Sequence, residues 1–310
     1  MSTQNNKKVG VVLMTYGSAT TAEHVAEYFE RIYKGRASAA LVADFEERYR
    51  LVGGSPLVDI TKAQAKALGE LLGERYVVRA GMRHSEPFIK DMVAECVHES
   101  AEVLVGVILS PQFSAPIMEA YKTAFMEAAR AQSVDHAVVA GPWPTEEHFV
   151  ELLARKTDEA LVKLAGEGLS APVVFTTHSL PQQVVEKDPG YLVQLRATID
   201  AVRNKLDLGV EWHAAYQSAG HTPEEWLKPD LTDILAMLAK EDKRAVLIVP
   251  VQFLADHLEI LYDLDIAARA QCEERGIAYR RIALPNTDPL FIESLRAVVE
   301  QAERGASPSL

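Results

Sequence analysis

Short apolar stretches alternate along the chain with longer segments in which apolar residues recur at a helical period. Several of the short stretches are almost wholly apolar, which is typical of strands covered on both faces. They therefore indicate parallel sheets. The predicted strands are VGVVLMT (9–15), RYVVRAG (75–81), VLVGVILS (103–110), HAVVAG (136–141), APVVFTT (171–177), VEWHAAY (210–216), RAVLIVP (244–250) and IAYRRIA (277–283).

The intervening segments have the pattern of amphipathic helices. The clearest of them span residues 61–74, 86–99, 146–165, 191–206 and 289–303. Strands that alternate with helices indicate βαβ units and hence the α/β class. We expect two similar doubly wound, Rossmann-like domains, each with a parallel sheet flanked by helices, and an active-site cleft between them.

The two halves of the chain resemble each other at their strand ends. VVLMT runs into Tyr16 and VVFTT runs into His178, whereas VGVILS and AVLIV run into segments that contain Gln112 and Gln252. In open α/β sheets, ligands collect beyond the carboxyl ends of the strands. Two such edges that face each other would form a cleft.

A stretch rich in proline and glycine, residues 141–144, suits an extended hinge between the halves. We place the N-terminal α/β domain at residues 1–143 and the C-terminal α/β domain, which carries His178 and Glu259, at residues 144–286. Residues 287–310 then form a C-terminal helix that packs back on the first domain.

The densest group of candidate catalytic residues lies in PVQFLADHLEILYDLD, residues 250–265. On a helix Asp256, Glu259 and Asp263 would share one face. Three carboxylates on one stripe repel one another unless a cation or proton lies among them. The alternative is a solvated acidic face, but the apolar flanks and the preceding strand favour a site.

His178 is the second candidate because it stands at a predicted strand end, shortly before Pro181. Imidazole nitrogen and carboxylate oxygen together suit Fe²⁺ and similar divalent metals. One histidine and one glutamate leave coordination positions open, as a site that hands its metal on requires. From the sequence, His178 is equally suited to be a base or a metal ligand.

Composition narrows the functional classes. The chain has 310 residues and a formal net charge of −12, which argues against a nucleic-acid partner because phosphate binding needs a basic face. Cys96 and Cys272 lie far apart, so neither a zinc ribbon nor a four-cysteine iron–sulfur cluster is expected. The apolar runs 9–14 and 245–255 are too short or interrupted to span a membrane. We expect a soluble cytoplasmic monomer.

The chain also resembles the ferrochelatase family, and specifically the coproporphyrin-type enzymes of Gram-positive bacteria. The likeness extends over nearly the whole length in eight ordered blocks. The blocks are LMTYGS (13–18), ERYRLVGGSPL (47–57), GMRHSEPFI (81–89), SPQFS (110–114), THSLP (177–181), YQSAGHTPEEWLKPD (216–230), PVQFLADHLEILYDLD (250–265) and LPNTDPLFIESL (284–295).

This resemblance implies an enzyme of haem biosynthesis that inserts Fe²⁺ into coproporphyrin III to give iron coproporphyrin III. Iron is then a substrate, no prosthetic group or iron–sulfur cluster is required, and contacts with other haem-pathway enzymes are transient. Three alternatives stay open at this stage: a protoporphyrin IX ferrochelatase, a cobalt or sirohydrochlorin chelatase, and a haem or porphyrin carrier without catalysis.

The resemblance also implies roles for individual residues. His178 and Glu259 are the catalytic pair at the metal side of the porphyrin, with Asp263 as a relay. Tyr16 faces the opposite side of the macrocycle, where Gly17 leaves space for a flat ligand. The expected porphyrin-binding residues are Tyr16, Tyr33, Lys34, Arg48, Tyr49, Ser55 and Tyr121.

Two departures from the family pattern affect this assignment. Relatives often carry arginine where this chain has Tyr33 and Lys34, so carboxylate binding there depends on Lys34 and the neighbouring Arg31 and Arg36. Lysine lacks the bidentate fork of arginine. Some relatives carry a glutamate where this chain has Ala267. An outer metal-relay site is therefore expected to be weak.

Overall fold

In the computed structural model, which describes residues 7–207, 209–220 and 223–306, eight strands form two four-stranded parallel sheets. The strand order is β2-β1-β3-β4 in the first sheet and β6-β5-β7-β8 in the second, so the two sheets have the same topology. The strands are β1 (Val9–Thr15), β2 (Tyr76–Met82), β3 (Val103–Ile108), β4 (His136–Val139), β5 (Val173–His178), β6 (Trp212–Gln217), β7 (Ala245–Pro250) and β8 (Ala278–Arg281).

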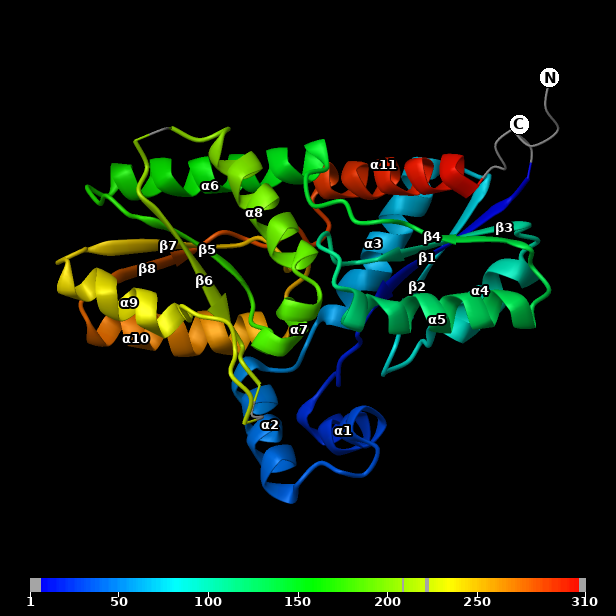
Figure 1. Ribbon diagram of the computed structural model, residues 1–310, viewed down its shortest axis with the longest axis horizontal. Helices are drawn as coiled ribbons and strands as arrows, with labels where there is room; N and C mark the ends of the chain where they lie inside the picture. The colour runs from blue at the N-terminus through cyan, green and yellow to red at the C-terminus, as the bar shows by residue number, and fades with distance from the viewer. Residues whose placement is uncertain (1–6, 208, 221–222, 307–310) are drawn as a thin grey trace.

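Helices cover both faces of each sheet (Figure 1). Those of the first half are η2 (Ala22–His24), α1 (Val25–Tyr33), α2 (Ala39–Val52), α3 (Leu57–Leu72), α4 (Ile89–His98) and α5 (Ala115–Ala131). Those that follow are α6 (Glu147–Gly166), α7 (Gln182–Lys187), α8 (Gly190–Arg203), α9 (Leu231–Lys240), the π-helix η3 (Ile260–Ala268), α10 (Arg269–Glu274) and α11 (Pro289–Ala306). The prediction of two parallel sheets flanked by helices is confirmed, and each predicted strand overlaps an observed one.

One hydrophobic core is shared by the two halves. Successive side chains of a strand point to opposite faces. In β1, Val11 and Leu13 therefore enter the shared core, whereas Val12 packs under α4 and α5. In β5, Phe175 enters the same shared core and Val174 packs on the other face, under α9 and the π-helix. This common core holds the two sheets in a fixed relation.

Helix α11, which is red in Figure 1, lies against α6 and α3. Glu303 near its end accepts hydrogen bonds from Arg75 at 2.7 Å and from the Tyr76 hydroxyl at 2.8 Å. The last helix is therefore attached to the first sheet as well as to α6. The residue-level domain boundaries stay predictions.

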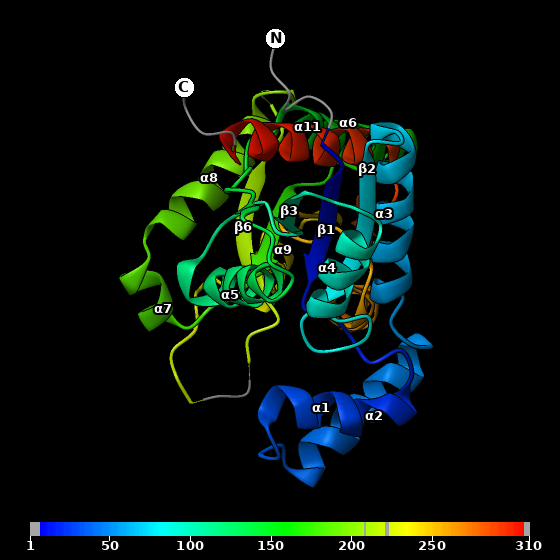
Figure 2. The same ribbon diagram turned by 90° about the vertical axis from the view of Figure 1, so that its right-hand side faces the viewer.

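Helices α1 and α2 project from the rest of the first half (Figure 2). The Ser38 side chain accepts a hydrogen bond from the Leu41 amide and caps the start of α2, and Gly53 ends the helix with a positive φ of 78°. Phe29 and Tyr49 belong to a small apolar cluster that joins these helices to the second half. We call α1 and α2 the cap.

Candidate functional site

The central strand of each sheet delivers one candidate residue at its carboxyl end. Tyr16 follows β1 directly, and His178 is the last residue of β5. β1 lies between β2 and β3, and β5 lies between β6 and β7, so both residues stand beside a point where the strand order reverses. Ligands of doubly wound sheets bind at such points.

His178 and Glu259 lie close together, with 3.6 Å between the histidine Nε2 and the glutamate Oε2. His257 approaches the same oxygen, its Nε2 lying at 3.5 Å. The Nδ1 atoms of His178 and His257 face the backbone oxygens of Ser179 and Ala255. A carbonyl oxygen can only accept, so Nδ1 carries a proton in both rings and both Nε2 atoms turn toward Glu259.

The environment keeps Glu259 ionised. Burial would raise the pKa of its carboxyl group, but the charge of His178 and the hydrogen bond from His257 outweigh burial and hold the pKa well below its usual range. For His257, burial lowers the pKa of the imidazole. The hydrogen bond to Glu259 and the charge of Glu259 outweigh burial, so the pKa is raised. The carboxylate side chain is 40% exposed, so a ligand can reach it.

Asp263 lies in the π-helix that starts directly after Glu259, and it accepts a hydrogen bond from the Ser218 hydroxyl. Burial raises the pKa of Asp263 and the charge of Glu259 raises it further, against the lowering effects of Ser218 and Arg48. Because a π-helix bonds i to i+5, it changes which side chains share a face. Glu259 immediately precedes this helix, four positions before Asp263, and its charge acts on the Asp263 carboxyl group.

The predicted stripe of three carboxylates is wrong at Asp256. This residue precedes the helical turn, accepts a hydrogen bond from the Asn286 side chain at 2.7 Å and lies 3.4 Å from the Arg281 guanidinium. Asp265 also pairs with Arg281, through two hydrogen bonds of 2.9 and 2.7 Å. The run of acidic residues therefore divides: Asp256 and Asp265 neutralise the partly buried Arg281, and Glu259 and Asp263 are left for the site.

The first half contributes a wall of aromatic and basic side chains. Tyr16 is 41% exposed, and its ring packs against the His84 ring at a tilt of 50°, with 4.5 Å between centroids. Arg83 lies 5.6 Å from the ring centre of Tyr121, which is buried in α5. Burial raises the pKa of Tyr16, and the charge of Glu259 contributes in the same direction. Tyr16 therefore lies within the electrostatic reach of the carboxylate of the other half.

The space predicted beside Gly17 is already filled. Its φ is +91°, and a Cβ atom there would lie 2.5 Å from the Ser85 hydroxyl oxygen. Ser85 in turn accepts a hydrogen bond from the Ser18 amide at 3.2 Å. Glycine is thus required at position 17 by the turn after β1 and by the close approach of Ser85.

Arg48 and Tyr49 connect the cap to the site. The Arg48 guanidinium lies 4.8 Å from the ring centre of Phe45 and 4.9 Å from that of Tyr262 in the π-helix, and it pairs with Asp44 at 2.7 Å. The Tyr49 hydroxyl shares a 2.9 Å hydrogen bond with Ser18. Arg48 therefore bridges α2 and the helix that carries Asp263.

The other predicted binding residues are distributed around the cap. Ser55 is buried, and its hydroxyl has no hydrogen-bond partner among the described residues. Tyr33 is 37% exposed at the end of α1 and packs edge-on against Phe29. Lys34 is exposed and adopts the left-handed conformation that ends α1.

Sequence reasoning did not select three residues that belong to this neighbourhood: Arg83, His84 and Ser218. All three had a usable signal. Arg83 and His84 follow the end of β2, and Ser218 follows the end of β6, as Tyr16 follows β1. Treating every strand end in a parallel sheet as a site position would have found them.

The arrangement suits the transfer of a metal better than its storage. Among residues 7–207, 209–220 and 223–306, no group of three or more His, Cys, Asp or Glu side chains is arranged to hold a metal ion. His178 and Glu259 can offer two donors to an incoming cation, and the same groups can accept protons. In the described part of the chain, no helix is long and apolar enough to cross a membrane.

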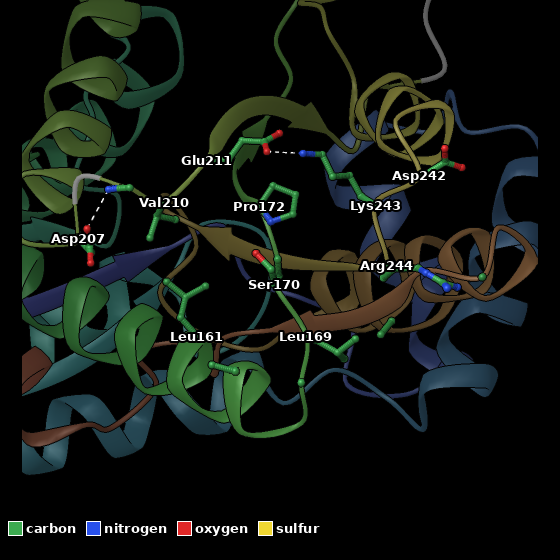
Figure 3. Close-up of a pocket in the computed structure, with 16 residues that line it drawn as sticks. Leu161, Leu169, Ser170, Pro172, Asp207, Val210, Glu211, Asp242, Lys243 and Arg244 are labelled. Atoms are coloured by element: carbon green, nitrogen blue, oxygen red, sulfur yellow. Dashed lines mark hydrogen bonds and ion pairs between the residues drawn. The ribbon is translucent and has the colours of Figure 1, made fainter.

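A cavity of about 1130 Å³ lies elsewhere, at the amino ends of the second sheet (Figure 3). Pro172, Glu211 and Lys243, which precede β5, β6 and β7, line it, and Glu211 and Lys243 form an ion pair of 2.5 Å. His178 stands at the opposite end of β5. Its lining among the described residues contains no histidine or cysteine, so this cavity offers no donor set comparable to His178 and Glu259.

Comparisons with known proteins are consistent along the whole chain. A family model described as Ferrochelatase matches residues 8–303. A curated coproporphyrin III ferrochelatase from Anoxybacillus flavithermus is 34% identical over 99% of this chain and 100% of its own length. Another from Listeria innocua is 33% identical over 96% of this chain and 98% of its own length.

Solved structures agree on the fold. SirB from Bacillus subtilis with Fe³⁺ matches with a TM-score of 0.63 at 13% sequence identity, and the match covers 97% of this chain and 100% of that one. The siroheme enzyme CbiX matches with a TM-score of 0.55 at 9% identity over 96% of this chain and 99% of the other. These likenesses establish the two-domain chelatase fold.

Proposed function

The chain belongs to the ferrochelatase family, and on that premise we propose that it inserts Fe²⁺ into coproporphyrin III to give iron coproporphyrin III in haem biosynthesis. It is a metal chelatase of the lyase class. The observation that supports the proposal most directly is the position of Glu259, which lies between the imidazoles of His178 and His257 at 3.6 and 3.5 Å.

Metal insertion must remove two protons from the porphyrin, because two pyrrole N–H groups occupy the hole that Fe²⁺ enters. One Fe²⁺ and one free porphyrin thus give one metalloporphyrin and two protons. We propose that His178 accepts a pyrrole proton or presents Fe²⁺, and that Glu259 holds the metal or orients the imidazole. Asp263, whose carboxyl pKa is raised by burial and by the charge of Glu259, then passes protons or metal along the π-helix.

Two effects together lower the barrier to metal insertion. Bending the macrocycle exposes the nitrogen lone pairs and can supply about 1 to 5 kcal/mol drawn from binding elsewhere on the ligand. A positioned base contributes about 10² to 10⁴ in rate. We assign the bending to the wall that contains Tyr16 and Tyr121, and the proton removal to His178.

The substrate proposal rests on charge. Coproporphyrin III carries four propionates and protoporphyrin IX carries two, so the former needs more cationic partners. Arg31, Lys34, Arg36, Arg48 and Arg83 stand in the cap or at the end of β2. Arg31 and Arg48 also pair with Glu27 and Asp44, but a local group of cationic side chains in a chain with a net charge of −12 still favours the tetracarboxylate.

The test is anaerobic insertion of Fe²⁺ into coproporphyrin III, protoporphyrin IX and sirohydrochlorin in parallel, with Co²⁺ as a second metal. We expect coproporphyrin III with Fe²⁺ to give the highest kcat/KM. A higher kcat/KM for protoporphyrin IX would make that porphyrin the assigned substrate. A preference for sirohydrochlorin would overturn the proposal. Porphyrin binding without any insertion would indicate a carrier.

We further propose that the enzyme works as a cytoplasmic monomer that needs no prosthetic group and meets other haem-pathway enzymes transiently. Light scattering of the purified protein tests the monomer, and cell fractionation tests the location. Full activity of protein that contains no chromophore and no bound iron before the reaction would support the absence of a prosthetic group.

A further inference from the structure

The hydrogen-bond ladder between β5 and β7 ends just before His178. The two strands pair in register as far as Thr176 and Pro250, and the Val251 amide then donates to the Thr176 carbonyl at 3.0 Å. The next β5 donor on this side is the His178 amide. Its acceptor is the side-chain oxygen of Gln252, at 3.0 Å.

The other end of the Gln252 side chain is also fixed. Its Nε2 donates to the Tyr191 hydroxyl at 2.8 Å. Tyr191 begins α8 and is 1% exposed, packed with Leu180 and Leu195. An amide held at both ends has a defined orientation, because its oxygen and its nitrogen each have one suitable partner. Gln252 therefore connects the rigid start of α8 to the backbone of His178.

The backbone of His178 is held from both neighbouring strands. On the β6 side, the Ser179 amide donates to the Gln217 carbonyl at 2.7 Å. On the β7 side the partner is the Gln252 side chain. Ser179 also provides the carbonyl oxygen that fixes the His178 ring through Nδ1. The place of the imidazole relative to Glu259 thus depends on backbone bonds on either side of it.

We propose that Gln252 is a positioning residue: its side chain extends the β5–β7 ladder by one bond and thereby holds the His178 imidazole against Glu259. The inference rests on the proposed function, because its kinetic test measures iron insertion. Reactive groups must be held within a fraction of an ångström, and a displacement of about 1 Å can cost about a hundredfold in rate.

The test compares Gln252→Leu, Gln252→Glu and Tyr191→Phe. Leucine keeps the volume and removes both hydrogen bonds. Glutamate keeps an acceptor for the His178 amide and can accept from the Tyr191 hydroxyl. Phenylalanine removes only the outer partner. Gln64→Leu is the matched control, because Gln64 is also a buried glutamine, donating to the Asn286 carbonyl at 2.8 Å, and lies outside the proposed machinery.

We expect Gln252→Leu to lower kcat for iron insertion about tenfold or more and to leave the KM for porphyrin within about twofold. Tyr191→Phe should give a smaller loss in the same direction. Gln64→Leu should lower the Tm without lowering kcat once the protein is folded. A kcat for Gln252→Leu equal to that of the unmodified enzyme would overturn the inference.

Amide hydrogen exchange provides a readout that does not depend on catalysis. In the unmodified protein the His178 amide should be protected. Exchange there should become at least about tenfold faster in Gln252→Leu, recover in Gln252→Glu and stay slow in Gln64→Leu. Unchanged exchange in Gln252→Leu would exclude the proposed bond. An inactive unmodified enzyme with the expected exchange pattern would instead contradict the proposed function alone.

Discussion

Tyr16 and His178 occupy equivalent positions at the ends of β1 and β5, the second strands in two sheets of identical order. One half thus presents a phenol and the other an imidazole at the same structural place. The halves share a hydrophobic core, which sets the position of the two groups relative to each other. The site therefore has two walls, one aromatic and one able to bind protons or a cation.

Replacing His178 with Ala should lower the rate of iron insertion by about 10² to 10⁴, the usual contribution of a positioned base. Porphyrin affinity should change little, since the aromatic wall is untouched. Stopped-flow absorbance measures insertion, and fluorescence quenching measures binding. His213→Ala is the matched control, because His213 pairs with Glu211 at 3.0 Å near the remote cavity. Insertion near the normal rate in His178→Ala would rule out the assigned role.

Replacing Gly17 with Ala should destabilise the fold more than the same change at two other glycines. At position 17 a positive φ of +91° combines with a clash against Ser85, so the loss should exceed about 2 kcal/mol. At Gly53, where φ is +78° but the space is open, about 1 kcal/mol is expected. Gly141 lies in open space and should tolerate the change. Urea unfolding measures all three, and equal losses would contradict the steric account.

Much of the fold was predictable because strand and helix periodicities are local properties of the sequence. The eight strands and the doubly wound arrangement follow from such patterns. The pairing of His178 with Glu259 was also predictable as far as both lie after apolar strands. The separation of Asp256 from the acidic stripe was not, because it depends on Arg281 and Asn286, which lie 25 or more residues away in the sequence.

Two further features could not be obtained from local patterns. The π-helix differs from an α-helix by the choice of a backbone partner one residue further on, and a window of apolar positions does not distinguish the two. The contact of Arg48 with Tyr262 joins segments more than 200 residues apart. Such contacts depend on how the cap lies against the second half.

The pKa of His84 leads to a prediction about pH. Burial and the neighbouring positive charge of Arg83 lower the pKa of the imidazole from 6.5 to about 4. The unfolded chain therefore takes up a proton at His84 before the native protein does, so this residue costs stability as the pH falls from about 6.5 to about 4. Tyr16, which packs against the ring, stays neutral throughout this range.

We accordingly expect the unfolding free energy of His84→Phe to fall less than that of the unmodified protein between pH 7 and about pH 4.5. Urea unfolding at a series of pH values gives this difference. An NMR titration of the imidazole in the unmodified protein gives the pKa directly. A midpoint near 6.5 would show that burial and Arg83 do not act on the ring as described.

Arg48 should matter for holding the cap against the π-helix. Arg48→Met keeps much of the side-chain length but removes the guanidinium from between Phe45 and Tyr262 and from Asp44. We expect the KM for porphyrin to rise about tenfold and the unfolding free energy to fall by about 1 to 2 kcal/mol, because cation–π contacts that are shielded from water are worth about that much.

Arg50→Met provides the control from the same helix. Arg50 is more exposed and pairs with Glu46 and Glu47 on the solvent side of α2, and surface ion pairs contribute about 0 to 1 kcal/mol. The KM of Arg50→Met for porphyrin should stay within about twofold of that of the unmodified enzyme. Equal effects of the two changes would mean that positive charge at any position on α2 attracts the porphyrin. A selective effect of Arg48→Met would instead show that the position of the Arg48 guanidinium, between Phe45 and Tyr262, is what matters.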